Sequence, residues 1–383
     1  MALAMVIAVV PMTLSYADSC GNAHSRSAVV ATEIASFHDN GTVFGLSFSP
    51  DSKYLATSTY AHDEIRIWDW RSGHVIKEMK VPNVNKFGGG EAGQTSESVL
   101  FNPTKPIIAA CLVGYNEGSQ GFITTTIWDV DSGAYKQGLI ADAVCQGIAF
   151  SPDGSRLLET IYNGKREPRV VVYDTDTWQP LWNLRAAKVD AAALGISWDG
   201  RFGAIKSSDS EPLPEANRAH SVSRVYVFDL QNGKITGTFD TGTGDGSSFQ
   251  HLTWNPDNQH IAFGDSTDRQ TTKGYTTDVA VKIMDIKTGE LVLTQQSGDH
   301  EGSLSFLRYT PSGKYLIQGK VSDTVQIWDA NHLHLQQEIA VPTSAGAISS
   351  DGCYLALGEW RDSNTGILSN IVFGPKVTIW RLK

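Results

Sequence analysis

A repeated pattern of short strands and turns constrains the fold of this chain more than any other feature. From Phe150 to Asp174, FSPDG is followed by the apolar run LLETIY, a polar insert and RVVVYD, and the same succession of parts recurs seven times. One such unit forms a small sheet that cannot bury both of its faces alone. Packing against neighbours around a ring buries them. Because each unit is about 40–60 residues long and contains several strands, the repeat predicts a β-propeller.

The units share the positions at which their strands end. The first strand of each ends at Phe48, Phe101, Phe150, Ile196, Trp254, Tyr309 and Ile348. The turns that follow are rich in Pro, Asp, Asn and Gly, because Pro fixes φ, Asp and Asn bond their own backbone, and Gly accepts a positive φ. The third strands end in an aromatic–Asp pair or a variant of it, at Trp68-Asp69, Trp128-Asp129, Tyr173-Asp174, Phe228-Asp229, Met284-Asp285, Trp328-Asp329 and Trp380-Arg381.

At these residues the chain resembles the WD-repeat family, over about residues 28–383. The resemblance implies an all-β fold, a seven-bladed β-propeller whose blades are four-stranded antiparallel sheets. The chain departs from the family at Met284 and Arg381, and the Gly-His pair that usually opens a repeat is mostly missing. In the family, such a His joins a buried hydrogen-bond set with Ser or Thr, Asp and Trp. The resemblance implies two structural sets of this kind here, His38, Thr57, Asp63 and Trp68, and His300, Asp323 and Trp328.

The two ends of the chain predict how the ring closes. The last unit stops at Lys383 after its third strand, and a lone strand-like run, Ala28 to Ser36, precedes the first unit. Adding the N-terminal strand to the last blade removes an open sheet edge. We therefore expect Val29–Ala35 to pair with Val377–Leu382.

The N-terminus predicts export. An apolar run from Ala2 to Val10 is followed by Pro11 and the small-x-small ending Ser15-Tyr16-Ala17. This is the layout of a secretory signal peptide, although no Lys or Arg precedes the apolar run. We expect a signal peptide at 1–17, a linker at 18–27 and one propeller at 28–383, in a secreted or periplasmic protein whose mature chain has no membrane span. The alternative is a cytoplasmic protein with an apolar N-terminal end.

Four cysteines leave the redox state open. They are Cys20, Cys111, Cys145 and Cys353, and an exported chain with this even number is able to form two disulfides in three possible pairings. Cys111 and Cys353 fall in apolar strand patterns. We interpret these two as small buried hydrophobic residues.

The units differ mainly between their second and third strands. Five of them carry inserts there, starting at Gly114, Asn163, Ser208, Asp265 and Glu359. In a propeller these connections emerge on the same face as the blade-to-blade links, whereas the short turns emerge on the other. We call these the long-loop face and the short-turn face. Loops on a rigid scaffold often carry binding residues, although surface loops also tolerate extra length as neutral insertions.

Tyr, Trp and Arg, the residue types that anchor protein interfaces, occur on the long-loop face. The candidate partner-binding residues are Tyr60, Tyr115, Lys165, Arg166, Arg218, Arg269, Tyr275, Trp360 and Arg361. The net charge of −10 disfavours a nucleic-acid partner, which requires a basic face. These features predict a non-catalytic interaction or scaffold module that binds a protein or peptide.

Motifs for catalysis, metals and cofactors are weak. The glycine-rich loop from Gly88 has Gln94 in place of a phosphate-binding Lys, and no H-E-x-x-H pair is present. We therefore expect no metal and no cofactor. The alternative function is a secreted propeller enzyme, of hydrolase, lyase or lactonase type, with a site at the channel mouth. Its candidate residues are His62, Asp209, His220, Asp265 and Glu359.

Overall fold

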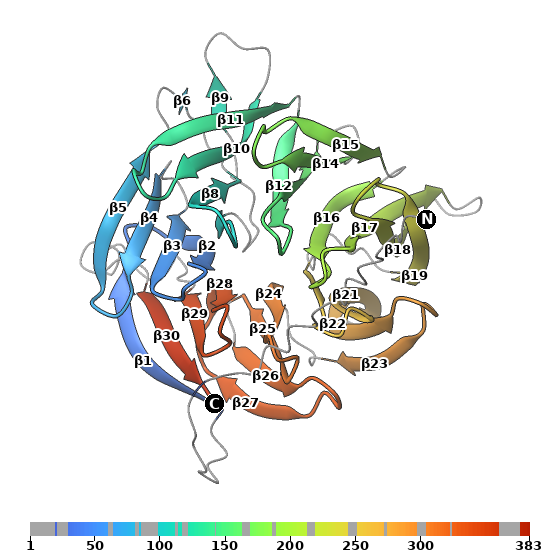
Figure 1. Ribbon diagram of the computed structural model, residues 1–383. Helices are drawn as coiled ribbons and strands as arrows, with labels where there is room; N and C mark the ends of the chain where they lie inside the picture. Colours follow the sequence, from blue (N-terminus) through green and yellow to red (C-terminus); the bar gives the residue numbers. More distant parts are fainter. Residues whose placement is uncertain are drawn as a thin grey trace, which may run out of the picture.

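The computed structural model of the chain describes residues 20, 30–59, 64–80, 84–85, 99–111, 114–116, 122–141, 143–162, 169–185, 189–212, 219–243, 251–271, 274–296, 304–321, 324–359 and 376–383. Within these residues every regular element is a β-strand. The strands form seven antiparallel sheets arranged as blades around a ring (Figure 1). The predicted all-β, seven-bladed propeller is confirmed.

In blades 1 to 6 the four main strands run in chain order from the channel to the rim. Blade 1 contains β2 (Val43–Phe48), β3 (Tyr54–Thr59), β4 (Glu64–Asp69) and β5 (His74–Lys80). Blade 2 contains β7 (Val99–Phe101), β8 (Ile107–Ala110), β10 (Phe122–Asp129) and β11 (Tyr135–Ala141), with a side ladder of β6 (Val84–Asn85) and β9 (Gly114–Asn116). Blade 3 contains β12 (Val144–Phe150), β13 (Arg156–Tyr162), β14 (Arg169–Asp174) and β15 (Pro180–Arg185).

The second half of the ring follows the same plan. Blade 4 contains β16 (Val189–Ile196), β17 (Phe202–Pro212), β18 (Ala219–Asp229) and β19 (Ile235–Thr243). Blade 5 contains β20 (Leu252–Trp254), β21 (His260–Thr271), β22 (Gly274–Asp285) and β23 (Leu291–Gln296). Blade 6 contains β24 (Leu304–Tyr309), β25 (Tyr315–Lys320), β26 (Val325–Asp329) and β27 (Leu335–Ile339). Blade 7 contains β28 (Thr343–Ile348), β29 (Tyr354–Glu359), β30 (Lys376–Leu382) and, as its outermost strand, β1 (Ala31–His38).

The strand ends agree with those predicted from the repeat. All seven first strands end at the predicted bulky residue, and six of the third strands end at the predicted Asp. In most of the turns after the first strands one residue has φ between 58° and 73°, at Ser52, Gly154, Gly200, Asn258, Gly313 and Gly352. Gly and Asn tolerate this conformation best, which explains why these turns are so uniform in sequence.

Apolar side chains collect between neighbouring blades. Seven clusters of buried residues occupy the contacts between adjacent blades around the ring. Between blades 1 and 2, for example, Ile67 and Met79 pack in one cluster with Phe101 and Trp128. Each sheet is thus covered on both faces by its neighbours, so the closed ring is the stable unit.

The N-terminal strand closes the ring as predicted. β1 pairs antiparallel with β30, from Ala31 opposite Leu382 to His38 opposite Lys376. The side chain of Gln337 in β27 holds the start of this strand, because its Oε1 accepts hydrogen bonds of 2.7 Å from the backbone N–H groups of Val30 and Ala31. Blade 7 is therefore completed by residues from both ends of the chain, as Figure 1 shows for β1 and β30.

All four cysteines form disulfides, so the interpretation of Cys111 and Cys353 as simple buried hydrophobic residues is wrong. Cys111 is bonded to Cys145, with 5.7 Å between their Cα atoms, and Cys353 is bonded to Cys20, with 5.1 Å. Cys111 and Cys353 are buried, as expected. The Cys111–Cys145 bond depends on the ring, because the ring brings the end of the second strand of blade 2 beside the first strand of blade 3.

The hydrogen-bond set of blade 1 includes Asp39, which was not among its predicted members. Trp68 Nε1 donates to Thr57 Oγ1 at 3.0 Å, and Thr57 Oγ1 donates to Asp39 Oδ2 at 2.5 Å. Arg66 Nη1 pairs with Asp39 Oδ1 at 2.6 Å. His38 is the last residue of β1 and is exposed, whereas the next residue turns inward and is buried. Trp68, Thr57 and Asp39 thus form a hydrogen-bonded set in blade 1.

Of the remaining residues of the two predicted hydrogen-bond sets, the structure describes only Trp328. Asp63, His300 and Asp323 lie outside the described residues. Trp328 is buried at the end of β26, and its Nε1 has no hydrogen-bond acceptor among the residues that the structure describes.

Candidate binding surfaces

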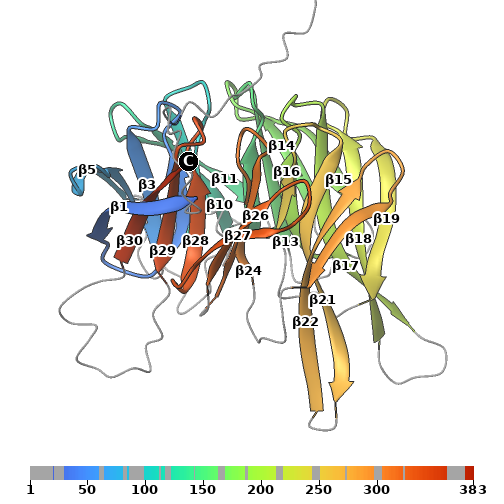
Figure 2. The same cartoon turned by 90° about the horizontal axis from the view of Figure 1, so that it is seen from below.

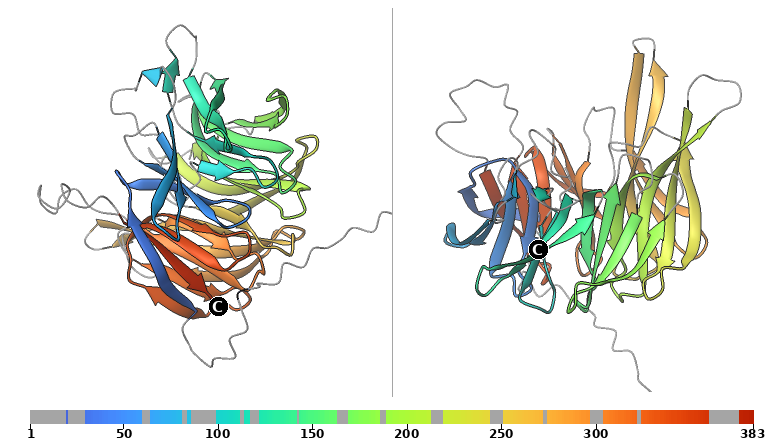
Figure 3. Two further views of the ribbon diagram at one scale, coloured as in Figure 1. Left: turned by 60° about the vertical axis from the view of Figure 1, so that its left-hand side comes forward. Right: turned by 90° about the horizontal axis from the view of Figure 1, so that it is seen from above.

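Two pairs of long strands, β17–β18 in blade 4 and β21–β22 in blade 5, extend on the long-loop face, and we call these pairs the arms. The insert of blade 5, predicted as a loop, instead continues β21 and β22, whose pairing runs without interruption from His260–Asp285 to Thr271–Gly274. In blade 4, β17 and β18 likewise pair out to Pro212–Ala219. The β21–β22 hairpin projects well beyond the ring in Figures 2 and 3. The described parts of these two inserts are therefore extensions of the blades.

The structure places three of the nine candidate partner-binding residues on strands. Tyr115 lies in β9, opposite Asn85 of β6 and Phe122 of β10. Arg269 lies in β21 opposite Thr276, and Tyr275 lies in β22 opposite Gln270. The other six, Tyr60, Lys165, Arg166, Arg218, Trp360 and Arg361, lie outside the described residues.

A buried ion-pair cluster joins blades 4 and 5 where the arms begin. Asp265 of β21, 2% exposed, lies 3.5 Å from Lys206 Nζ of β17 and also pairs with Lys282 of β22. Lys282 Nζ donates in addition to the carbonyl of Thr241 in β19, at 2.8 Å. Burial lowers the pKa of Lys206, against the opposing effect of Asp265. Asp265, a candidate for the enzyme alternative, therefore sits in a closed interface between blades.

Of the other candidates for the enzyme alternative, only Glu359 has a side chain that the structure describes. Glu359 lies 3.8 Å from Lys376 Nζ, which also pairs with Glu33 of β1 at 3.0 Å. His62 lies outside the described residues, and Asp209 and His220 are described only as members of β17 and β18. Among the described side chains, no group of three or more His, Cys, Asp and Glu is arranged to hold a metal ion.

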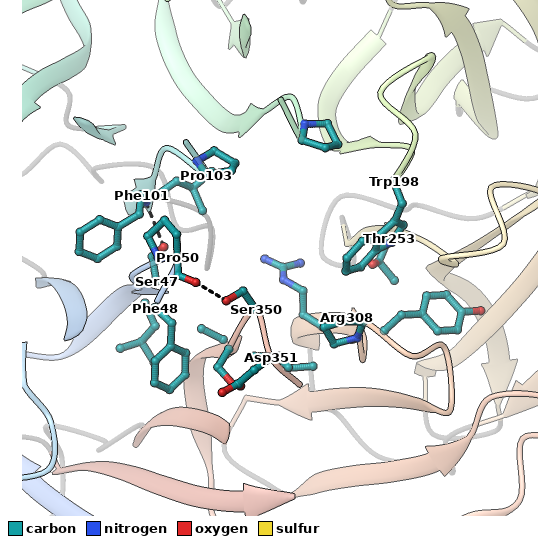
Figure 4. A pocket seen from close by; sticks show the side chains of 18 of the residues that line it. Ser47, Phe48, Pro50, Phe101, Pro103, Trp198, Thr253, Arg308, Ser350 and Asp351 are labelled. Atoms are coloured by element: carbon teal, nitrogen blue, oxygen red, sulfur yellow. Dashed lines mark hydrogen bonds between the residues drawn. The ribbon is translucent and has the colours of Figure 1, made fainter. Parts of the chain in front are cut away.

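The channel opens on the short-turn face into a cavity of about 730 Å³ (Figure 4). Its wall comes from the inner strands and from the turns that follow them. Turn residues at its rim include Pro50, Pro103, Pro152, Trp198 and Pro311.

Arg308 of β24, which was not among the residues singled out from the sequence, also lines this cavity. Its guanidinium points toward the middle of the cavity (Figure 4). A signal for it was present in the repeat, because the residue before the strand end is uncharged in every other unit. These residues are Ser47, Leu100, Ala149, Gly195, Thr253 and Ala347.

His251, which directly precedes β20, is a buried histidine whose charge Arg308 opposes. Its Nε2 lies 3.1 Å from the carbonyl oxygen of Leu304. Burial first, and the positive charge of Arg308 second, lower the pKa of His251 from 6.5 to about 3. The side chain is therefore neutral in the folded protein at ordinary pH.

This histidine is expected to make the fold sensitive to acid. Below pH 6.5 the unfolded chain binds a proton at His251 that the folded chain does not bind until about pH 3, so stability falls as the pH falls through this window, by about 1 kcal/mol per pH unit. We expect His251→Gln to reduce the loss of unfolding free energy between pH 6.5 and 4.5 by about 2 kcal/mol. Urea unfolding at both pH values measures it, and parallel losses in the two proteins would contradict it.

Comparison with known proteins agrees with the fold. A family model described as "WD domain, G-beta repeat" matches residues 31–69. Protein tipD of Dictyostelium discoideum is 24% identical over 242 residues, which cover 54% of this chain and 36% of that protein. Coronin-like protein crn1 of Schizosaccharomyces pombe is 25% identical over 225 residues, which cover 57% of this chain and 33% of that protein. The match thus spans about a third of each curated relative.

A solved structure extends the likeness to nearly the whole ring. Hydrazine synthase of Kuenenia stuttgartiensis superposes with a TM-score of 0.67 at 17% identity, covering 91% of this chain and 97% of that chain. At this identity the likeness concerns the fold alone. In the described residues no helix is long and apolar enough to cross a membrane. The repeat pattern, the ring of seven blades and the matched repeat together show a seven-bladed β-propeller that carries a WD-type repeat at residues 31–69 and resembles WD-repeat proteins.

Proposed function

We propose that the chain is an exported, non-catalytic module that binds a protein or peptide partner through its long-loop face. The observation that carries this proposal is the pair of arms, β17–β18 and β21–β22, that neighbouring blades extend on that face. A partner that docks on paired strands meets a surface that is already ordered. Such preorganisation lowers the entropy cost of association.

The base of the arms supports this role. Lys206 and Asp265 join blade 4 to blade 5 across their interface, and Lys282 joins the carboxylate to the outer strand β19. Removing one member of a buried ion pair leaves an uncompensated charge and is costly, so the two blades are held in one arrangement. The arms therefore leave the ring from a common, fixed base.

The two disulfides support export. Disulfides persist in oxidising compartments and are rare in the cytosol, where thiols are kept reduced. The Cys111–Cys145 bond ties blade 2 to blade 3, and the Cys20–Cys353 bond ties the segment before the ring to blade 7, so both are structural bonds. They add to the signal-peptide pattern of residues 1–17, which lies outside the described residues.

The enzyme alternative has less support. Asp265 and Glu359 are engaged in ion pairs with lysines that join neighbouring strands and blades. The hydrazine synthase shares only the fold with this chain. At 17% identity its activity cannot be assigned to this chain. The ordered, paired strands of the two arms fit a binding role better than a catalytic one.

The test is affinity capture with matched variants of the intact protein. One variant carries Arg166→Ala, Trp360→Ala and Arg361→Ala on the long-loop face. A control variant carries Arg71→Ala, Arg201→Ala and Lys314→Ala, three exposed residues of the short-turn face. We expect the first variant to lose the captured partner at least about ten-fold, as hot-spot residues do, and the control to retain it. Equal recovery by all three proteins, or loss only in the control, would reject the proposal.

A further inference from the structure

A fully buried carboxyl group lies between blades 2 and 3. Glu159 of β13 has an exposed fraction of 0%, and its Oε1 accepts a hydrogen bond of 2.6 Å from Thr125 Oγ1 of β10 in the neighbouring blade. Among the residues that the structure describes, no hydrogen bond reaches its Oε2. Burial of a carboxylate is costly unless its charge is paired, whereas a neutral carboxyl group loses much less on burial.

Other buried acidic groups of the described chain lie beside cations. Asp39 pairs with Arg66 Nη1 at 2.6 Å, and Asp265 pairs with Lys282 Nζ. A cation this close favours the ionised form of a carboxyl group. Glu159 differs from them, because no cation is among the groups that act on it in the described part of the chain.

The strands that face Glu159 supply hydroxyl groups and a disulfide. β12 contains no charged residue, and β10 contains one only at its end. The hydroxyl groups of Thr124 and Thr125 act on Glu159 from β10. Thr125 Oγ1 also lies 3.7 Å from Sγ of Cys145, so it contacts both the carboxyl group and the Cys111–Cys145 bond. None of these groups carries a charge that would balance a carboxylate.

Tyr173 of β14 is the other titratable group that acts on Glu159. Burial first, and Glu159 second, raise the pKa of Tyr173, so its phenol stays protonated. Arg169, at the start of β14, acts on Tyr173 in the opposite direction. Burial raises the pKa of Glu159 above 4.5, against the smaller opposing effect of the neighbouring hydroxyl groups. Its carboxyl group is therefore protonated at pH values at which an exposed Glu is ionised.

We propose that Glu159 is a proton-dependent lock between blades 2 and 3. The protonated carboxyl group forms its hydrogen bond with Thr125 across the interface without burying a charge. Loss of the proton places an unpaired charge there, which the two blades accommodate only by separating and admitting water. β13 leads directly into the insert that carries Lys165 and Arg166, so the loosening starts at the base of that insert. The lock is a property of the fold and stands or fails independently of the function proposed above.

Raising the pH should weaken the fold through this group. Above pH 4.5 the unfolded chain loses the proton of Glu159, whereas the folded chain keeps it until its own, higher pKa is reached. The unfolding equilibrium constant should therefore rise by up to about ten-fold per pH unit across this window. This trend is opposite in direction to the one expected for His251.

The test compares urea unfolding of the full-length protein, of Glu159→Gln and of a control, Glu290→Gln, which alters an exposed carboxyl group of blade 5. Gln has nearly the size of Glu and cannot ionise. From about pH 4.5 to about pH 8, the unfolding equilibrium constant of the parent should increase at least about ten-fold relative to that of Glu159→Gln. The control should follow the parent. The contribution of His251 is common to all three proteins and cancels in the comparison.

A second measurement uses the intact protein alone, so the test holds even if Glu159→Gln does not fold. The infrared C=O stretch of a protonated carboxylic acid should persist above about pH 5.5, where exposed Asp and Glu groups are ionised. In hydrogen exchange at about pH 8, the amides of β10 and β13 should exchange faster in the parent than in Glu159→Gln, with no such difference in β24 and β25 of blade 6. Parallel unfolding of the parent and Glu159→Gln, or loss of the acid band by about pH 5.5, would overturn the proposal.

Discussion

A chain that begins at His38 is expected to unfold or to associate into oligomers, whereas a chain that begins at Asp18 keeps the fold. The shorter chain lacks β1, which forms the outer strand of blade 7 along β30. It also loses the buried side chains of Val30 and Phe37, which pack in the clusters on either side of that blade. Burial of each contributes about 2 kcal/mol, against a total stability of about 5–15 kcal/mol for a typical domain.

The loss of β1 also leaves an unpaired edge on β30, and exposed edges pair with other chains. Circular dichroism melting and size-exclusion chromatography with light scattering measure the two outcomes. Because the truncation also removes Cys20, a full-length Cys20→Ser protein separates the effect of the disulfide from that of the strand. A truncated protein that melts like the chain from Asp18 and stays monomeric would show that β1 does not close the ring.

Loss of the Cys111–Cys145 disulfide is the second change with a large expected effect. The bond ties blade 2 to blade 3 across 34 residues of chain, and in the chain-entropy account a loop of this length contributes about 3–4 kcal/mol. Both sulfur atoms are buried in the cluster between these blades. We expect Cys111→Ala/Cys145→Ala to lower the free energy of unfolding by about 3 kcal/mol.

Urea unfolding of the variant and of the oxidised parent measures this loss. Reductant should lower the unfolding midpoint of the parent and should change that of the variant less, because the variant retains only the Cys20–Cys353 bond. Thiol titration of the unfolded, unreduced parent should find no free thiol, since the four cysteines are paired. Two reactive thiols per chain, or equal midpoints for parent and variant, would contradict the expectation.

The ring was predictable because its information is local and repeated. The end of each first strand follows from a bulky residue before a Pro, Asp or Gly turn, and Phe48 and Ile348 show this equally at the two ends of the ring. Ring closure was also predictable, because the last unit lacks a fourth strand and Ala28 to Ser36 supplies one.

The features that the sequence did not reveal depend on contacts between blades. Cys111 reads as an apolar strand residue until blade 3 brings Cys145 beside it. Asp39 joins Thr57 because the chain leaves β1 after His38 and turns the Asp39 side chain inward. The polar stretch from Asp265 lacks an apolar alternation, so nothing in its pattern indicated that it continues β21 and β22 as a paired arm.

Hydrogen exchange on the intact protein, with and without its captured partner, would locate the binding surface. We expect the partner to slow exchange in the arms, β17–β18 and β21–β22, and in the peptides around Arg166 and Trp360. We expect little change in the turns of the short-turn face, such as those at Asp51 and Asp153. Protection confined to the short-turn face, with exchange in both arms unchanged, would contradict it.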